Sequence, residues 1–420
     1  MLPASVLLSV LAAVASVATA ADSSLASANS TNSCSMSTTI TAASAISQLN
    51  SCPTLDGQIT ISGDQVGALD LGNVQTIAGD VSIFNSSSIT SINLASIANV
   101  TGSLLMSALT TLNNIQLLKL TSANKLSFVS LPSLASLNLG SGLANVTSLT
   151  LSDTALASID KLLQFKTIGV LNVNNNKNIT SIDLSDLSNV TEGLTLSFNS
   201  DQASVKLPNL QSAANLTIQD VASLDISSLQ YVNGSFILGY NTFDSVSFDS
   251  LSSAGSSLQV FANNDLTTLN LPNLTQVGGE FRIFNNSLLR TVDIHNLKTV
   301  KGAAALAGEF GNLNWSGLGE VDGDFSLSAS ASNFSCSQFD KLQSSNKIKG
   351  HNYNCSSPSS TSLASRSGGS SSTGTRGSGS STSGSSQGSS SASSSKKNGA
   401  DYLAPGFLLS AVGAVAAALV

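Results

Sequence analysis

The sequence predicts an all-β fold, a parallel β-solenoid (β-helix) of about thirteen rungs of about 22 residues each. One phrase, apolar-x-Ser/Thr-apolar-Asn/Asp-apolar, recurs mostly 22 or 23 residues apart, as in Ile-Thr-Ser-Ile-Asp-Leu at residues 179–184. An alternating strand that ends near Asn closes each repeat, as in Phe-Arg-Ile-Phe-Asn at residues 281–285. A period of two inside this longer period is typical of short strands stacked rung on rung. Away from the ends, no segment keeps a helical period of 3.6 residues for three turns.

Each rung is expected to contain three strand segments in a fixed order. The first segment is the recurring phrase above, the second reads Leu-x-x-Val-x-Gly, as at residues 274–279 and 297–302, and the third is the alternating strand. Third segments can be followed from residue 59 to residue 325. A single rung cannot bury its apolar side chains, whereas stacked rungs share one continuous core.

Both ends of the stack are expected to carry a short helical cap, at residues 42–50 and 337–344, each enclosed by two cysteines. A cap covers strand edges that would otherwise pair with other chains. Four cysteines allow three disulfide connectivities, and we favour local pairing because each pair closes a loop of about 20 residues, worth about 3 kcal/mol. The predicted disulfides join Cys34 to Cys52 and Cys336 to Cys355. A zinc site is not favoured, because the cysteine spacing does not suit it and the two histidines, His295 and His351, are isolated.

The two ends of the chain are predicted to be processing signals. Residues 1–20 have an apolar core and end in Ala-Thr-Ala, which is typical of a secretory signal peptide. The solenoid domain with its caps is assigned to residues 21–355, and a Ser/Gly-rich stalk without apolar residues to residues 356–397. Residues 398–420 fit a GPI-attachment signal whose tail is removed. We expect Asn398 to be the attachment (ω) site, with a serine between 389 and 395 as the alternative. A tail-anchored helix is the other interpretation, but 18 apolar residues barely span a bilayer.

Composition supports an extracellular glycoprotein. Only 10% of residues are charged and the net charge is −7, so there is no basic surface for a nucleic acid. In a secreted chain, repeated Asn-X-Ser/Thr sequons predict several N-linked glycans. They occur at Asn29, Asn85, Asn99, Asn145, Asn178, Asn189, Asn215, Asn233, Asn273, Asn285, Asn314, Asn333 and Asn354.

Two polar columns are predicted to run up the outside of the stack, because side chains alternate along a strand. One consists of Ser91, Thr111, Ser136, Ser158, Ser181, Ser223, Ser245, Thr268 and Thr291. The other consists of Asp70, Asn93, Asn138, Asp160, Asp183, Asp225, Asn270 and Asp293. A glycan-binding surface, or a carboxylate pair for glycoside hydrolysis at Asp160 and Asp183, are two functional interpretations. We favour a structural ladder, because an active site would break the even spacing.

Two further repeated positions lie near the end of the third segment. The aromatic residues Phe84, Phe198, Tyr240, Phe261 and Phe284 are predicted to pack in the core, with sugar stacking as the alternative. A recurrent asparagine is expected to satisfy backbone groups in the bend. It occurs at Asn85, Asn175, Asn199, Asn241, Asn263 and Asn286. His295 is expected to be a solvated residue of a strand at residues 292–297.

The rung phrases resemble those of the L domains of insulin- and EGF-type receptors, which are right-handed, leucine-rich-repeat-like β-solenoids. Terminal cysteine pairs, a Ser/Gly stalk and a GPI tail in this order resemble the fungal GPI-anchored cell-wall organisation family of the ECM/SPS type. This resemblance implies a role in cell-wall integrity and morphogenesis, and it transfers no catalytic residues. By resemblance to fungal GPI proteins, Lys396 and Lys397 imply retention at the plasma membrane rather than transfer to wall glucan.

Taken together, these features predict a non-enzymatic, GPI-anchored glycoprotein on the outer leaflet of a fungal plasma membrane and in the cell wall. No catalytic residue, cofactor or metal site is expected. The expected contacts are the membrane, through the GPI lipid, and candidate wall glycans; the sequence names no protein partner and gives no sign of nucleic-acid binding. Two alternatives stay open: a GPI-anchored glycan-active β-helix enzyme, and a surface receptor or adhesin that binds its ligand through a solenoid face.

Overall fold

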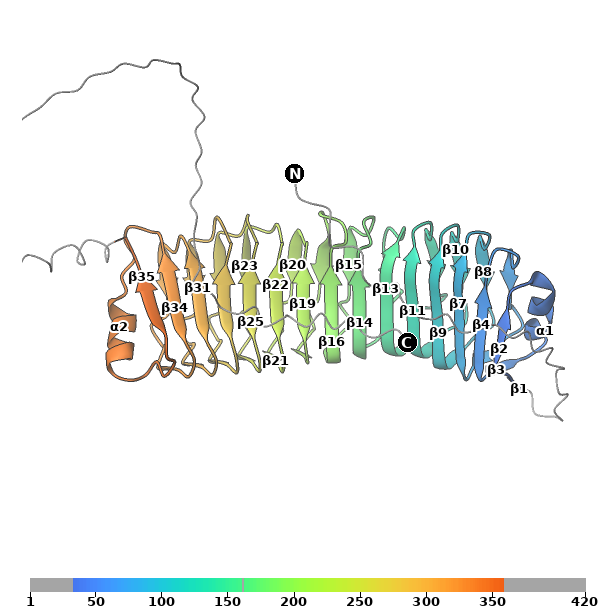
Figure 1. Cartoon of the computed structure of the whole chain (residues 1–420), viewed down its shortest axis with the longest axis horizontal. Coiled ribbons are helices and arrows are strands. Elements are labelled where there is room, and N and C mark those ends of the chain that lie inside the picture. The colour runs from blue at the N-terminus through green and yellow to red at the C-terminus, as the bar shows by residue number, and fades with distance from the viewer. Residues whose placement is uncertain (1–32, 161, 359–420) are drawn as a thin grey trace, which may run out of the picture. The chain divides into compact units, whose positions relative to one another are not determined.

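The computed structural model describes residues 33–160 and 162–358. The chain divides into two compact units, residues 1–368 and 369–420, and all described residues lie in the first. They form a parallel β-solenoid of about 13 turns, as the repeats predict, with every strand pairing parallel (Figure 1). The segments predicted to be a signal peptide and a GPI-attachment signal, with Asn398, and most of the predicted stalk lie outside the described residues.

The three segments of each rung appear in the predicted order. First segments are β5 (Leu69–Asp70), β8 (Ser91–Asn93), β10 (Asn114–Gln116), β12 (Ser136–Asn138), β15 (Ser181–Asp183), β17 (Ser204–Lys206), β20 (Ser223–Asp225), β23 (Ser245–Ser247), β26 (Thr268–Asn270), β29 (Thr291–Asp293) and β32 (Asn312–Asn314). Second segments are β6 (Thr76–Ile77), β18 (Ser212–Ala213), β21 (Tyr231–Val232), β24 (Ser253–Ala254), β27 (Gln276–Val277), β30 (Thr299–Val300) and β33 (Glu320–Val321). Third segments are β4 (Gln58–Ser62), β7 (Asp80–Ser86), β19 (Leu216–Gln219), β22 (Phe236–Gly239), β25 (Leu258–Phe261), β28 (Phe281–Phe284), β31 (Ala304–Gly308) and β34 (Phe325–Ala329).

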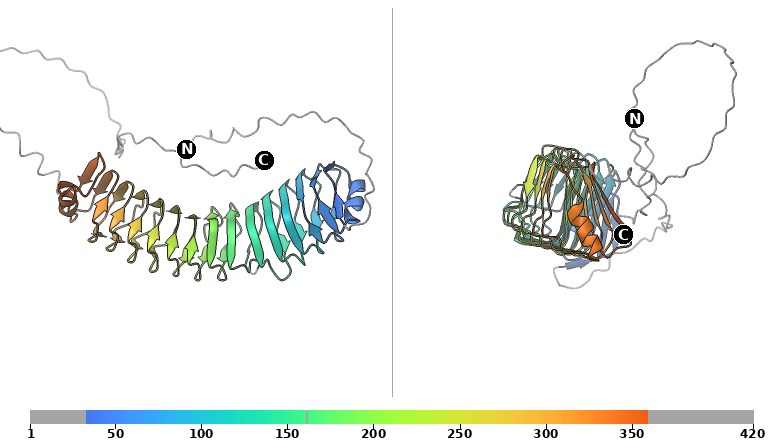
Figure 2. Two further views of the ribbon diagram at one scale, coloured as in Figure 1. Left: turned by 90° about the horizontal axis from the view of Figure 1, so that it is seen from below. Right: turned by 90° about the vertical axis from the view of Figure 1, so that its left-hand side faces the viewer.

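In five rungs the second and third segments run together as one long strand. These strands are β9 (Asn99–Leu109), β11 (Ser122–Leu131), β13 (Asn145–Thr154), β14 (Thr167–Asn174) and β16 (Asn189–Ser197). Second and third segments belong to one 24-stranded sheet, whereas first segments form three smaller sheets of four, three and four strands. Figures 1 and 2 together show that the stack bends into an arc, with the third segments on its concave side.

The core is a set of apolar columns, one residue per rung. Leu69, Ile92 and Ile115 are in register on neighbouring first segments, and all three are buried. Because such columns run the length of the stack, each rung buries its apolar side chains against the next, as in other solenoids.

The recurrent glycine of the second segment is explained by how closely the rungs approach. A Cβ atom added to Gly302 would lie 2.7 Å from the carbonyl oxygen of Gly279, and one added to Gly323 would lie 2.6 Å from the carbonyl carbon of Gly302. No side chain fits there, so the motif ends in glycine for steric reasons.

Helical caps close both ends, as expected. The first contains η1 (Ala43–Ala45) and α1 (Ile46–Asn50) beside β1 (Ser33–Ser35), β2 (Thr38–Ile40) and β3 (Thr54–Asp56), and the second contains α2 (Ser337–Ser344) and β35 (Tyr353–Ser356). The predicted disulfides Cys34–Cys52 and Cys336–Cys355 are present, with Cα–Cα distances of 5.7 Å and 5.9 Å. Within residues 33–160 and 162–358, neither these helices nor any other is long and apolar enough to cross a bilayer.

A bend with left-handed backbone ends the third segment in most rungs. The φ angle is positive at Asn85, Ala108, Ser130, Asp153, Asn175, Phe198, Asp220, Tyr240, Ala262 and Asn285, with values between 51° and 60°. We call these residues the corner column. The residue after each of them turns back into the core.

In five rungs this inward residue is a buried asparagine, and together these form an asparagine ladder of Asn176, Asn199, Asn241, Asn263 and Asn286. The Nδ2 of Asn263 donates to the carbonyl of Leu238 at 3.0 Å, and its Oδ1 accepts from the N–H of Asn241 at 2.9 Å. The prediction of a bend asparagine that satisfies backbone groups is therefore confirmed for four of the named residues. It is wrong for Asn85 and Asn175, which occupy the exposed corner column one residue earlier.

Candidate functional site

The Asn/Asp column of the first segments is structural, because its side chains cap the turn that follows. The Oδ1 atoms of Asp70, Asn93, Asn138, Asp183 and Asp293 each accept a hydrogen bond from the backbone N–H two residues later, at 3.0–3.3 Å. Such Asx turns stabilise a bend locally. Bonds between rungs also occur, since Asn93 Nδ2 donates to Asp70 Oδ1 at 2.8 Å. The prediction of a structural ladder is confirmed, although these side chains bond to the following turn more often than to the neighbouring rung.

The candidate carboxylate pair, Asp160 and Asp183, lies on neighbouring rungs and is also engaged by the fold. Asp160 Oδ1 accepts from the backbone N–H of Asp183 at 2.8 Å, and Asp183 Oδ1 accepts from the Ser185 hydroxyl at 2.5 Å. The Ser185 hydroxyl holds the pKa of Asp183 below its ordinary value. A glycosidase pairs an ionised carboxylate with a carboxylic acid that keeps its proton near neutral pH, and the lowered pKa of Asp183 does not suit the acid role.

Two predictions for the first segment are wrong in detail. Thr111 is not in the Ser/Thr column, where Asn114 takes that place; the Thr111 hydroxyl instead donates to the carbonyls of Ser87 and Ile89 in the loop before the strand. His295 lies in the turn after β29, which ends at Asp293, and its Nδ1 is 2.8 Å from Asp293 Oδ1. The strand ends early because Asp293 caps the turn.

Within residues 33–160 and 162–358, no group of three or more His, Cys, Asp or Glu residues is placed to hold a metal ion.

The aromatic residues of the third segment lie on the outer surface, so the prediction that they pack in the core is wrong. Phe198 and Tyr240 keep 43% and 49% of their surface exposed, and Phe84, Phe261 and Phe284 are half-buried. Strand alternation explains this for Phe261, since Leu258 and Val260 point inward and Phe261 must point outward. The same parity, read from the sequence, would have placed Phe84 and Phe284 outside.

Four of these rings form a continuous row, which we call the aromatic stripe: Phe198, Tyr240, Phe261 and Phe284. Adjacent ring centroids are 6.0 Å, 5.5 Å and 5.2 Å apart, and the last two rings are stacked at 11°. The guanidinium of Arg282 lies 4.6 Å from the centroid of Phe284 and 3.5 Å from Glu280. Phe198 and Tyr240 were missed as surface residues because the corner reverses the alternation just before the buried asparagine.

Phe198 and Tyr240 belong to the corner column, with φ angles of 52° and 59°. A left-handed backbone is uncommon for a bulky residue and costs on the order of 1–3 kcal/mol. Asn, Asp, Ser or Ala occupies the same column in other rungs. The fold therefore does not require an aromatic residue at either position.

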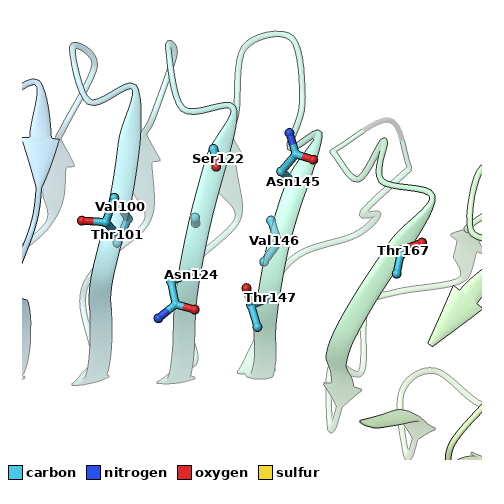
Figure 3. Close-up of a pocket in the computed structure, with 9 residues that line it drawn as sticks. Val100, Thr101, Ser122, Asn124, Asn145, Val146, Thr147 and Thr167 are labelled. Atoms are coloured by element: carbon cyan, nitrogen blue, oxygen red, sulfur yellow. The ribbon is translucent and has the colours of Figure 1, made fainter. Parts of the chain in front are cut away.

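A shallow depression of about 420 Å³ crosses the long strands on another part of the 24-stranded sheet (Figure 3). Its wall includes Val100, Thr101, Asn145, Val146 and Thr147. These belong to the sequons of Asn99 and Asn145, which lie on either side of Ser122 in the sheet register.

The other predicted sequons are distributed over the solenoid. Asn29 lies outside the described residues; of the remaining sequon asparagines all are exposed except Asn189, which is half-buried. Before their corner residues, the outward side chains of the third segments from Thr60 to Ser328 include no sequon asparagine. On this concave surface a sequon occurs only at its end, at Asn354 in β35, and at the corner residues Asn85 and Asn285.

Comparison with known proteins gives relatives over most of the chain. It is 50% identical over 326 residues to the cell surface GPI-anchored protein ECM33 of Candida albicans, covering 78% of this chain and 79% of that protein. It is 33% identical over 306 residues to protein ecm33 of Aspergillus fumigatus, covering 73% and 76%. It is 32% identical over 323 residues to the cell wall mannoprotein PST1 of Saccharomyces cerevisiae, covering 76% and 72%.

No family model matches the chain. No solved structure matches it significantly either. These relatives nevertheless align at identities of 30% or more over more than two thirds of the chain. The chain therefore belongs to the ECM33/PST1 family of fungal cell-surface and cell-wall proteins.

Proposed function

We propose that this protein is a non-enzymatic, GPI-anchored surface glycoprotein that supports the organisation and integrity of a fungal cell wall. The observation that carries the proposal is the 50% identity to a protein named as a GPI-anchored cell-surface protein, over 78% of the chain. Other relatives are named as cell wall proteins, including PST1 of Saccharomyces cerevisiae and ecm33 of Schizosaccharomyces pombe. The names of these relatives are those of surface and wall proteins rather than enzymes.

The non-enzymatic part is supported by what the candidate carboxylates do in the fold. Asp160 and Asp183 accept hydrogen bonds from backbone and hydroxyl groups, in the same way as other members of their column. Asn occupies equivalent places at Asn93, Asn138 and Asn270. A site whose members are interchangeable between rungs suits a repeated structural role better than catalysis.

The proposal includes the processing of both ends. Residues 1–20 would direct secretion, residues 356–397 would form the stalk, and a GPI lipid attached at Asn398 would replace the tail. Four of the sequon asparagines with exposed side chains, Asn99, Asn145, Asn215 and Asn233, would carry glycans on the second segments or in the turns that precede the third segments.

A rescue experiment tests this function. A host strain that lacks its own family member should regain resistance to a wall-perturbing dye and to wall-lytic enzymes when it expresses the full chain. The same chain without residues 403–420 should be secreted and should fail to rescue, because it cannot receive the lipid. Equal rescue by the secreted form would contradict a role that needs the anchor, and absence of rescue by the full chain would contradict the wall function itself.

A further inference from the structure

The aromatic stripe is an apolar strip whose neighbouring outward column is polar except at Ile237. Phe198 and Tyr240 are exposed, and the ring of Phe261 leans over Gly239, whose Cα would place an added Cβ 2.9 Å from that ring. The strand register places the stripe along the long axis of the stack, across five successive rungs. Gln219 and Asp220 belong to the rung between Phe198 and Tyr240. Exposed rows of aromatic rings are typical of binding surfaces.

The polar side chains beside the stripe are free to bind a ligand. Thr195, Thr217 and Gln259 point outward from the third segments, and Gln219 lies in the same column as Phe261. Within the described residues none of these four side chains hydrogen-bonds to another protein group, in contrast to the Asn/Asp column on the first segments. Water satisfies them in the free protein, and a ligand can replace that water.

This surface carries little net charge. Among the outward residues of the third segments in these rungs the charged side chain is Arg282, which is paired with Glu280 and covers Phe284. Lys177, from the loop of the preceding rung, donates from its Nζ to the carbonyl of Phe198 at 2.7 Å. Asp220 is the charged residue of the corner column here. Aromatic rings with unengaged amides and hydroxyls suit a neutral ligand rich in hydroxyl groups, because sugar rings pack their C–H faces on aromatic rings and bond through their edges.

The same surface is the one that the chain's own glycans would leave open. Apart from the corner residues Asn85 and Asn285, the outward columns of the third segments contain no sequon between Thr60 and Ser328, although sequons lie on the other parts of the rungs. Sequons border the stripe at both ends: Asn285 adjoins Phe284, and Asn178 adjoins Lys177, whose Nζ donates to the carbonyl of Phe198 at 2.7 Å.

We propose that the concave surface around Phe198 and Tyr240 binds a linear neutral polysaccharide of the cell wall along the aromatic stripe. The proposal deepens the proposed wall function and rests on it for the class of ligand. Stacked rungs repeat about every 4.8 Å, so ring and hydrogen-bonding groups recur along the polymer's length. A weak contact per sugar unit would add up over several rungs.

The test compares the full-length protein, extracted from membranes with detergent, with a Phe198→Ala/Tyr240→Ala double variant. Alanine already occupies the corner column at Ala108 and Ala262, so the variant should fold, whereas asparagine at either site would create a new sequon. Tyr231→Ala is the matched control, because Tyr231 is 41% exposed on a second segment away from the stripe. Melting curves with unchanged cooperativity establish that each variant is folded.

Each protein is sedimented with particulate β-1,3-glucan, β-1,6-glucan or chitin, and with uncoated silica as the blank. We expect the parent and Tyr231→Ala to bind at least one polysaccharide equally, at low and high salt alike, because the ligand is neutral. The double variant should bind the polysaccharide at least about tenfold more weakly than the parent, because it lacks two central aromatic contacts.

Three results would overturn the proposal: no polysaccharide retains the parent, the double variant binds as well as the parent, or Tyr231→Ala loses as much as the double variant. A photo-crosslinker at position 240 that traps one defined protein, with no polysaccharide bound, would assign the surface to a protein partner instead. Because the assay needs neither the anchor nor a wall phenotype, its failure leaves the rescue result unaffected.

Discussion

At the scale of single residues, the corner of each rung decides which side chains enter the core. A left-handed residue is followed by an inward residue, and where the latter is asparagine its amide replaces the hydrogen bonds that the strand ladder loses in the bend. Buried backbone groups left without partners are expensive, so these asparagines stabilise the stack although they are polar.

Replacing Asn263 by alanine should therefore destabilise the protein by about 3–5 kcal/mol, since it removes bonds to Leu238, Asn241 and Asn286 and leaves buried groups unpaired. Thermal or urea unfolding of the variant measures the loss. Asn264→Ala is the control, because Asn264 is exposed and adjacent in sequence, and it should stay within about 0.5 kcal/mol of the parent. Equal effects of the two changes would show that burial of the amide is not the cause.

The carboxylate pair gives a second prediction at this scale. Asp160→Asn combined with Asp183→Gln should fold, reach the surface and rescue the wall-defective strain as the parent does, because Asn138 and Gln116 already occupy the same column. Glutamine is used at position 183 because asparagine there would create a sequon with Ser185. A well-folded, normally displayed variant that fails to rescue would instead indicate a catalytic acid or nucleophile, whose loss lowers the rate by orders of magnitude.

At the scale of elements, the caps are the parts that differ from the repeat. Each short helix lies over the last rung at its end and is linked to it by one disulfide. At the C-terminal end Phe339 of α2 packs on Trp315 and Phe325, with ring centroids 6.0 Å and 5.2 Å away. Each cap therefore stabilises the protein in two ways: its helix covers the apolar side chains of the final rung, and its disulfide restricts the unfolded chain.

Removing one disulfide should cost about 3 kcal/mol by the loop-entropy model for loops of this length. Cys34→Ala/Cys52→Ala is preferred to serine, because serine at position 34 or 52 would create sequons at Asn32 and Asn50. In this variant limited proteolysis should cut first within the first rungs. In Cys336→Ala/Cys355→Ala it should cut first within the last rungs. Cleavage that begins at the centre of the stack in both variants would contradict the capping role.

Acid should weaken the C-terminal cap. The Nζ atom of Lys349 contacts Glu320 and Asp322, and Lys301 lies 3.3 Å from Asp322. The hydrogen bond from Lys349 is the main cause that holds the pKa of Asp322 below its ordinary value, and that from Asn352 does so for the pKa of Asp324. A carboxyl group whose pKa is lowered by folding stabilises the protein above its unfolded pKa of about 3.9 and loses this effect as the pH falls through the folded value.

We therefore expect a constant melting temperature between about pH 5 and 7 and a decline below about pH 4. The melting temperature of Lys349→Gln should decline less than that of the parent. Asp322 in this variant has no hydrogen bond from Lys349, so its protonation removes less stabilisation. Melting curves over this pH range, at low and high salt, measure the difference. Identical declines in the two proteins would exclude the Lys349 cluster as a source of acid sensitivity.

At the scale of the whole molecule, the solenoid is a set of rungs that each contact only their neighbours, so its stability is close to a sum over rungs and interfaces. The ends are the weakest points of such a stack, which explains why the cysteines occur only there. The long regular body also separates the concave surface of the third segments from the surfaces that carry most sequons.

Anchoring is the prediction that concerns the whole chain. Phosphatidylinositol-specific phospholipase should release the protein from membranes, and the released form should lack residues 399–420, because GPI transfer to Asn398 removes this tail. Mass spectrometry of the C-terminal peptide should find the attachment site at Asn398. Extraction that requires detergent, together with an intact peptide ending at Val420, would show a membrane helix instead.

Much of this protein could be predicted from the repeats alone. The period of about 22 residues, the two-residue alternation and the terminal cysteines determined the parallel solenoid, its caps and its disulfides, because each depends on local spacing that every rung repeats. The Asn/Asp column could be assigned a structural role for the same reason.

The sequence could not determine the surface around Phe198 and Tyr240. Alternation predicts the inward or outward direction of a side chain only while the strand stays extended, and a left-handed corner shifts that parity by one residue. The tertiary structure decided that these rings lie outside, that Phe198 reaches Tyr240 across an intervening rung, and that Asn176 rather than Asn175 is buried. Contacts between rungs depend on how about 22 residues close each turn, which is a property of the folded stack and of no single repeat.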